Sequence, residues 1–171
     1  MQDQAGLPTA AITRRIARAS AWKLDKPFAQ ENYQVMNYGP GGLISFHTDE
    51  VPLSSEIQTK EQFKSYWFTG GPRLATSMIY LKSPQTGGRT VFPFIKLSVP
   101  PSPHALLFWH NVTPDGSPDT RAMHAACPVV RGDKWIMNKW VKLTPHWDSH
   151  QCQVKDRDSQ GAFSRWGSMS K

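Results

Sequence analysis

Three side chains of this 171-residue sequence are of the types that bind a redox-active iron. His47 and Asp49 are separated by one residue, and His124 begins a second strand-like run much later in the chain. Two imidazoles and one carboxylate on one side of Fe(II) leave further coordination positions open, as in non-haem iron sites. Neutral imidazole suits Fe(II), and the carboxylate offsets part of its charge. The three residues therefore predict a metal centre for oxidation chemistry.

The chain around these residues indicates how they could meet. In a strand over residues 44–49, alternation would place His47 and Asp49 on the same face. The chain before His124 is long enough to loop out and pair back beside that strand. An isolated His-x-Asp is more often a polar pair on a solvated strand. The metal hypothesis therefore depends on His124 and on Lys134, which follows His124 by ten residues.

A series of short motifs occurs between about residues 14 and 147. They are Asn37-Tyr38-Gly39, His47-x-Asp49, Gly87-Gly88-x-Thr90-Val91-Phe92-Pro93, His124-Ala125-Ala126-Cys127-Pro128 and Lys134-Trp135 with Asn138-Lys139-Trp140. In this order and at these spacings, they resemble the catalytic domain of the prolyl 4-hydroxylases, most closely the collagen-type alpha subunit.

The resemblance implies an Fe(II)- and 2-oxoglutarate-dependent dioxygenase that hydroxylates C4 of a peptidyl proline. His47, Asp49 and His124 would hold Fe(II), and L-ascorbate would re-reduce iron oxidised in unproductive turnovers. The expected substrate is a collagen-like peptide. Two alternatives remain open: a hydroxylase of another proline-rich peptide, and a non-catalytic jelly-roll binding module, either a fragment or a pseudoenzyme.

Lys134 follows a Gly-Asp turn and precedes an apolar run, so it would point into a barrel, where an unpaired ammonium is costly. The resemblance supplies a partner, the distal carboxylate of 2-oxoglutarate. At ~4 Å and an effective dielectric near 20, this pair is worth about 4 kcal/mol before desolvation. By the same resemblance, Tyr38 and Thr90 would hydrogen-bond 2-oxoglutarate and Trp140 would line its pocket. Their structural alternatives are a half-buried strand tyrosine, a strand-forming threonine and a core aromatic residue.

The long connection over residues 50–72 follows the first two metal ligands and is typical of a functional lid. The aromatic run at residues 66–68 offers surfaces for proline rings, or else docks the loop onto the body. Arg73 and Trp109 fall where the resembled family contacts its peptide. At Glu50 an aromatic residue is frequent in the family, and we expect this glutamate to bring a second carboxylate close to the metal site.

The strand and turn signals predict the fold. Eight or so short strands with one helix in front indicate a mainly β protein, a double-stranded β-helix (jelly roll, cupin-like) with an N-terminal supporting helix. We expect the helix over residues 7–22, with Thr9 as N-cap. The predicted parts are residues 1–29, with the helix packed on the sheet, residues 30–147, the dioxygenase jelly roll, and residues 148–171, a loosely ordered tail.

The net charge of +7 does not indicate a nucleic-acid partner. Basic residues cluster near the start, over residues 14–26, the others are scattered, and no basic stripe interleaved with aromatic residues appears. No run of 18 apolar residues exists, so no membrane span is predicted.

Residues 1–10 contain no readable secretory signal. The resembled family works in the endoplasmic reticulum, so the resemblance implies the lumen of that compartment, with a signal upstream or a fragmentary sequence. It also implies protein disulfide isomerase as a possible partner subunit. Cys127 and Cys152 could form one disulfide, although a buried free thiol is favoured at Cys127. Asn111-Val112-Thr113 matches an N-glycosylation acceptor.

Overall fold

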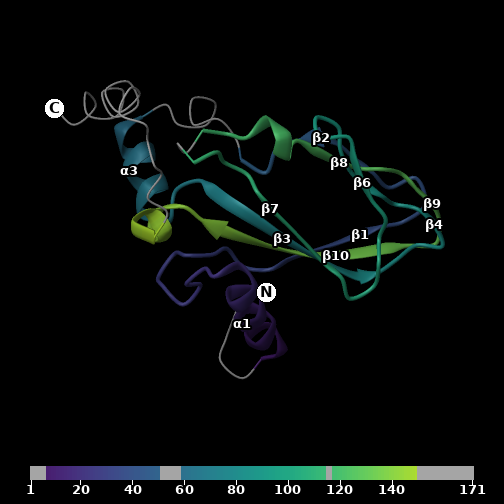
Figure 1. The fold of residues 1–171 in the computed structure, drawn as a ribbon, viewed down its shortest axis with the longest axis horizontal. Coiled ribbons are helices and arrows are strands. Elements are labelled where there is room, and N and C mark those ends of the chain that lie inside the picture. Colours follow the sequence, from purple (N-terminus) through teal and green to yellow (C-terminus); the bar gives the residue numbers. More distant parts are fainter. Residues whose placement is uncertain (1–6, 51–58, 115–116, 150–171) are drawn as a thin grey trace.

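Two four-stranded antiparallel sheets form the body of the protein (Figure 1). The structure is a computed structural model that describes residues 7–50, 59–114 and 117–149. The strand order is β1-β10-β3-β7 in the first sheet and β2-β8-β5-β6 in the second, and β4 pairs with β9. The predicted jelly roll with an N-terminal helix is therefore confirmed.

The elements in chain order are α1 (Pro8–Ser20), β1 (Gln34–Tyr38), β2 (Ile44–His47), α3 (Lys60–Phe68), β3 (Arg73–Lys82), β4 (Thr86–Gly87), β5 (Thr90–Phe92), β6 (Leu97–Val99), β7 (Leu106–His110), η1 (Thr120–Ala122), β8 (His124–Ala126), β9 (Val129–Arg131), β10 (Lys134–Lys142) and η2 (Thr144–Ser149). No helix among the described residues has the length and apolar character needed to cross a bilayer.

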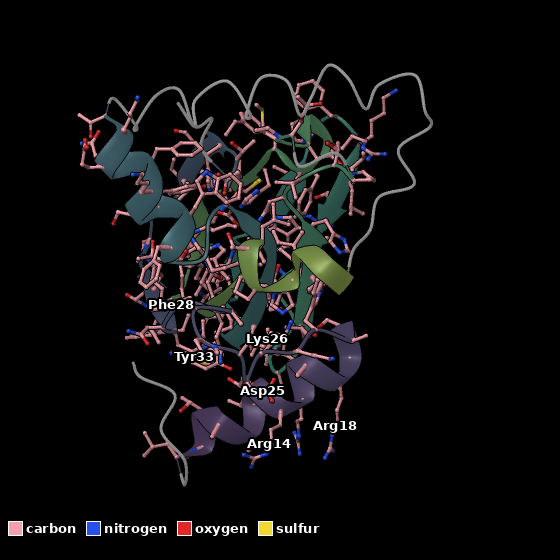
Figure 2. All side chains as sticks on the ribbon, turned by 90° about the vertical axis from the view of Figure 1, so that its left-hand side faces the viewer. Arg14, Arg18, Asp25, Lys26, Phe28 and Tyr33 are labelled. Carbon is pink, nitrogen blue, oxygen red and sulfur yellow. The ribbon has the colours of Figure 1, made fainter. Side chains whose placement is uncertain are left out.

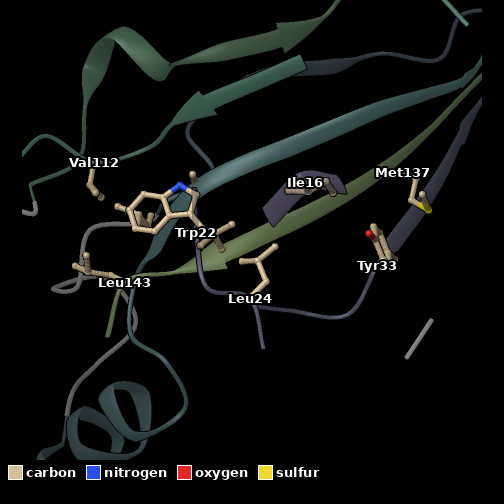
Figure 3. Packing of buried hydrophobic residues seen from close by; sticks show 10 residues of the cluster. Ile16, Trp22, Leu24, Tyr33, Val112, Met137 and Leu143 are labelled. Atoms are coloured by element: carbon tan, nitrogen blue, oxygen red, sulfur yellow. The ribbon is translucent and has the colours of Figure 1, made fainter. Parts of the chain in front are cut away.

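The first sheet carries a hydrophobic cluster on each face. On the outer face, side chains from α1 and the segment after it meet alternate residues of β3 and β10 (Figure 3). This cluster contains Ile16, Trp22, Leu24, Tyr33, Leu74, Ala75, Val112, Met137, Val141 and Leu143. On the inner face, a second cluster faces the second sheet. It contains Tyr38, Met78, Tyr80, Val129 and Ile136. The inner face is the one that meets the candidate site.

Helix α1 begins and ends inside the predicted range. Leu7 occupies the N-cap position without a side-chain hydrogen bond, and Pro8 follows in the first turn. Thr9 is buried within the helix, so the prediction of Thr9 as N-cap is wrong. Proline at the first helical position has no backbone N–H, so one fewer N–H group at this helix start needs a capping acceptor. Arg14 and Arg18 lie on the side of α1 away from the sheets (Figure 2), as a solvated basic face requires.

The strand-like run that begins at His124 is interrupted after Ala126. Pro128 has no N–H to donate, and β8 and β9 belong to different sheets on either side of it. Cys127, at the break, carries a free thiol and is half-buried rather than buried. Cys152 and all but the first two residues of the predicted tail lie outside the described residues. The division of the chain at residues 29 and 147 stays a prediction.

Candidate active site

An irregularity in β2 places His47 opposite His124. Ile44 pairs with Ala126 and His47 with His124, so β2 contains one residue more than β8 over the same stretch, which is a β-bulge. Ile44 packs against the inner cluster, and Phe46 is 59% exposed. The predicted strict alternation over residues 44–49 is therefore wrong, because the bulge breaks the two-residue period.

The three predicted metal ligands lie together. One ligand atom from each of His47, Asp49 and His124 lies within 4.8 Å of the others. Asp49 Oδ1 is 3.7 Å from His47 Nε2 and 3.9 Å from His124 Nε2. Asp49 and His124 are buried, whereas the His47 side chain is 36% exposed, so the cluster is open on one side. This donor set fits Fe(II) with positions left for other ligands.

Backbone carbonyl groups orient both imidazole rings. His47 Nδ1 lies 2.8 Å from Ser45 O, and His124 Nδ1 lies 2.9 Å from Ala122 O. A carbonyl oxygen only accepts, so each Nδ1 carries the proton and each Nε2 presents its lone pair toward Asp49. Burial lowers the pKa of His124, which favours its neutral form. Both rings are thus prepared to coordinate a cation through Nε2.

A residue that the sequence did not indicate, Thr76, contacts the carboxylate of Asp49, and Asn111 contacts Thr76 in turn. Thr76 Oγ1 donates to Asp49 Oδ2 at 2.5 Å, and Asn111 Nδ2 donates to Thr76 Oγ1 at 2.9 Å. Asn111 is only 1% exposed and its amide is engaged, so this asparagine is not an N-glycosylation acceptor. Thr76 carries no distinguishing sequence signal, since a threonine is ordinary in a strand.

Lys134 is buried in the interior between the sheets, with a relative exposure of 1%. Its Nζ lies 5.4 Å from the centre of the Tyr38 ring and 5.5 Å from that of Tyr80. Across the described part of the chain, Nζ has no hydrogen-bond partner. Burial lowers its pKa to about 8. A buried ammonium without an acceptor is costly, and a carboxylate from a bound dicarboxylate would satisfy it.

Hydroxyl groups lie around this lysine. Thr90 Oγ1 and Tyr80 OH are 2.9 Å apart, and Tyr38 OH makes only a weak bond of 3.7 Å to Met36 Sδ. Burial raises the pKa of Tyr80 and of Tyr38, and the charge of Asp49 adds to the rise at Tyr38. Both phenols therefore remain protonated donors. The sequence analysis did not identify Tyr80, because a tyrosine in a strand carries no signal that separates it from a core aromatic residue.

Arg73 and Trp140 form a separate group beside Asp49. The Arg73 guanidinium lies 3.8 Å above the Trp140 ring and donates to Asp49 O at 3.4 Å. It also donates to both carboxylate oxygens of Glu31, at 2.8 and 2.9 Å. Trp140 comes six residues after Lys134 on one strand, which spans about 20 Å. The structure therefore brings Trp140 to the metal-ligand end and not to the lysine.

Trp109 packs against a metal ligand. Its ring lies 4.8 Å from that of His124 and 5.4 Å from that of Phe92. The indole Nε1 is buried and finds no acceptor among the described residues. An aromatic face and an unpaired donor thus border the triad on the β7 side.

Glu50 does not face the metal ligands. Its Oε2 accepts from the backbone N–H of Arg73 at 2.5 Å, and its Oε1 accepts from Tyr66 OH at 2.9 Å. The expectation of a second carboxylate at the metal site is wrong, because both oxygens are committed to the start of β3 and to α3. Tyr66 thereby docks α3 onto the body, whereas Phe68 stays exposed. In the described part of the connection, α3 spans Lys60–Phe68, and residues 51–58 lie outside the described residues.

Comparison with known proteins agrees with this geometry. Residues 33–142 match the family model described as the 2OG-Fe(II) oxygenase superfamily. The human prolyl 4-hydroxylase subunit alpha-3 is 41% identical over 130 residues, which cover 76% of this chain and 22% of that protein. The Caenorhabditis elegans prolyl 4-hydroxylase subunit alpha-1 is 40% identical over 131 residues, or 75% of this chain and 22% of that protein. The chain thus spans about a fifth of the length of these relatives.

Among solved structures, a viral collagen prolyl hydroxylase from Paramecium bursaria Chlorella virus-1, in complex with 2OG, superposes with a TM-score of 0.61 at 29% identity. The alignment covers 78% of this chain and 69% of the viral protein. The clustered His47, Asp49 and His124, the family match and this shared fold lead to one conclusion. The chain belongs to the 2OG-Fe(II) oxygenase superfamily and is related to the prolyl 4-hydroxylase alpha subunits.

Proposed function

We propose that this chain hydroxylates C4 of a peptidyl proline in collagen-like sequences, with Fe(II) and 2-oxoglutarate. The observation that carries the proposal is the pairing of an open two-histidine, one-carboxylate cluster with the buried, unpaired ammonium of Lys134. The names of the human prolyl 4-hydroxylase subunit and of the viral collagen prolyl hydroxylase support proline as the target and collagen as the substrate class.

In this proposal, His47, Asp49 and His124 hold Fe(II). Bound together, Fe(II), 2-oxoglutarate and dioxygen supply the oxidising chemistry that inserts an oxygen atom into a C–H bond. The protein's residues bind and orient the reactants and exclude water. The two Nε2 atoms and Asp49 Oδ1 face the same point, which fixes the metal on the inner face of β2 and β8.

The cosubstrate is assigned to the interior between the sheets, beside Lys134. Its ammonium forms an ion pair with the distal carboxylate of 2-oxoglutarate, since no side chain among the described residues pairs with Nζ. Tyr38 and Thr90 donate hydrogen bonds to the same molecule, and Tyr80 holds Thr90 in place. Trp140, which the resemblance assigns to the cosubstrate, lies instead at the Asp49 end, beneath Arg73.

The peptide is assigned to the side where Arg73 and Trp109 lie. Arg73 is fixed by Glu31 and by the face of Trp140, so its position costs little entropy on binding. Trp109 packs against His124 and Phe92, which places its aromatic ring beside the metal ligands, where a pyrrolidine ring would lie. Both features suit an extended chain that lacks N–H donors at its prolines.

The proposal includes three features drawn from the family resemblance: L-ascorbate as the reductant that restores Fe(II), the endoplasmic reticulum lumen as location, and protein disulfide isomerase as a possible partner subunit. The relation to the prolyl 4-hydroxylase alpha subunits supports them. Co-purification of the expressed chain with protein disulfide isomerase tests the partner directly.

The activity is tested with a panel of collagen-like and other proline-rich peptides. Succinate release and a hydroxyproline in the product, both dependent on Fe(II) and 2-oxoglutarate, are the expected results. His47→Ala and His124→Ala should each abolish turnover, and unchanged activity in either variant would exclude the ligand assignment. A non-catalytic binding module is the alternative. Such a module would release no succinate. Under anaerobic conditions it would either show the weak visible absorption of an Fe(II)–2-oxoglutarate complex or show no such absorption.

A further inference from the structure

The two carboxylate oxygens of Asp49 have different surroundings. Oδ1 faces the Nε2 atoms of His47 and His124 at 3.7 and 3.9 Å. Oδ2 accepts a hydrogen bond of 2.5 Å from Thr76 Oγ1. That length is typical of a strong bond between a hydroxyl group and an ionised carboxylate. One oxygen is therefore available to a cation and the other is committed to the protein.

The direction of the Thr76 proton follows from its second neighbour. Asn111 Nδ2 donates to Thr76 Oγ1 at 2.9 Å, so the threonine oxygen acts as acceptor toward the asparagine. A hydroxyl group has only one proton, which is then directed to Asp49 Oδ2. Asn111 Oδ1 lies farther from the hydroxyl, at 3.4 Å. The three side chains form a short chain of hydrogen bonds that ends on the carboxylate.

Both residues are held by the first sheet. Thr76 lies in β3 between its register partners Trp109 of β7 and Trp140 of β10, and it is 0% exposed. The backbone N–H of Asn111 donates to Leu74 O at 2.9 Å, and Asp119 N donates to Asn111 O at 2.9 Å. Neither side chain can leave the carboxylate without breaking bonds in the sheet interior or exposing a buried polar group.

We infer that Thr76 and Asn111 are positioning residues that make Asp49 bind the metal through Oδ1 alone. The inference rests on the proposed iron site and extends it to residues that make no contact with the metal. Without the Thr76 bond, the carboxylate could turn and bind through both oxygens, which would occupy a position needed by the other reactants. Hydrogen bonds to metal-binding carboxylates commonly affect metal affinity about 10- to 100-fold.

Co(II) binding to the full chain tests the inference without turnover. Thr76→Val keeps the shape of the side chain and removes the hydroxyl group, whereas Thr76→Ser keeps the hydroxyl group. We expect Thr76→Val to raise the Kd for Co(II) about 10- to 100-fold. The visible absorption of the bound Co(II), which reports the number of its ligands, should also change. Thr76→Ser should restore both the Kd and the spectrum.

A purely structural role for Thr76 would lower the melting temperature of the Val variant and leave the Co(II) Kd and spectrum of the folded protein unchanged. That result would overturn the inference. Asn111→Ala provides the second variant, because it leaves Thr76 in place but no longer directs its proton. It should raise the Kd by a smaller factor, and an unchanged Kd in this variant would also overturn the inference. The proposed iron site itself would be wrong if the unmodified chain bound no Co(II), or if its Co(II) binding persisted in His47→Ala.

Discussion

The Nζ atom of Lys134 lies 5.4 Å from the centre of the Tyr38 ring, in the buried interior, where it finds no acceptor among the described residues. The π face of an aromatic ring attracts a cation but does not replace a carboxylate as partner. Burial consequently keeps the pKa of Lys134 at about 8 instead of the ordinary 10.5. The charge state of this residue links cosubstrate binding and folding stability to pH.

Cosubstrate affinity should depend on pH through Lys134. The ammonium form binds the distal carboxylate, and the free protein loses that proton as the pH rises through about 8. The Kd for 2-oxoglutarate should be constant below that pH and increase up to tenfold per pH unit above it. Calorimetric titration between pH 6 and 9.5 provides the measurement. A Kd that stays flat through pH 9.5 would show that Lys134 does not pair with the ligand.

The stability of the ligand-free protein should change in the opposite direction. The folded state disfavours the proton on Lys134, whereas the unfolded chain keeps it up to a pKa of 10.5. The unfolding free energy contributed by this residue therefore rises with pH across the window from about 8 to 10.5, by about 3 kcal/mol in total. Urea denaturation of the unmodified chain and of Lys134→Met isolates the contribution, since the Met variant lacks it. Parallel curves for the two proteins would contradict this account.

Removal of the lysine should affect one reactant more than the other. Lys134→Met should raise the KM for 2-oxoglutarate about 10- to 150-fold, since a hydrogen bond to a charged group contributes about 1.5–3 kcal/mol. The KM for the peptide should change little, because Arg73 and Trp109 lie at the other end of the site. Steady-state kinetics with each reactant varied in turn makes the comparison. An equal rise in both KM values would indicate a general disturbance of the fold.

The Tyr66–Glu50 hydrogen bond should hold α3 on the body. Tyr66→Phe removes the phenol that donates to Glu50 Oε1 at 2.9 Å and leaves Asp49 and its contacts in place. Amide hydrogen exchange over residues 60–68 should become faster, while Co(II) binding stays the same. Lys64→Ala, at an exposed position of the same helix, serves as the control. Exchange equal to that of the control would show that α3 is held by other contacts.

Replacing Gly87 should show whether the pairing of β4 with β9 requires a glycine at this position. Gly87 has φ +85°, and a Cβ there would collide with the carbonyl oxygen of Pro128. Gly87→Ala should therefore cost about 1–3 kcal/mol of unfolding free energy. Gly39→Ala is the matched control, because a Cβ at that glycine meets nothing within 4 Å. Thermal melting compares them, and equal melting temperatures would contradict the expected collision.

The sequence predicted the elements better than the contacts between them. Short strands with turn signals were sufficient for the jelly roll, whereas His47, Asp49 and His124 could be grouped only together with Lys134 and the series of motifs that resembles the prolyl 4-hydroxylases. The contacts around Asp49 could not be predicted, because Thr76 and Asn111 reach it through pairing of β3 and β7, which local pattern does not specify. Glu50 was misplaced for a related reason. Its partners, the Arg73 N–H and the Tyr66 hydroxyl, come from the far side of the long connection.

The β-bulge in β2, which adds one residue to that strand, affects which ring nitrogen of His47 faces a cation. Neither Ser45 nor Phe46 has a register partner on β8, and the carbonyl group of Ser45 accepts the Nδ1 proton of His47. A strand shortened by one residue would be more regular and would still turn the imidazole inward. It would, however, no longer select the tautomer, and the ring would lose affinity for a cation although its direction was unchanged.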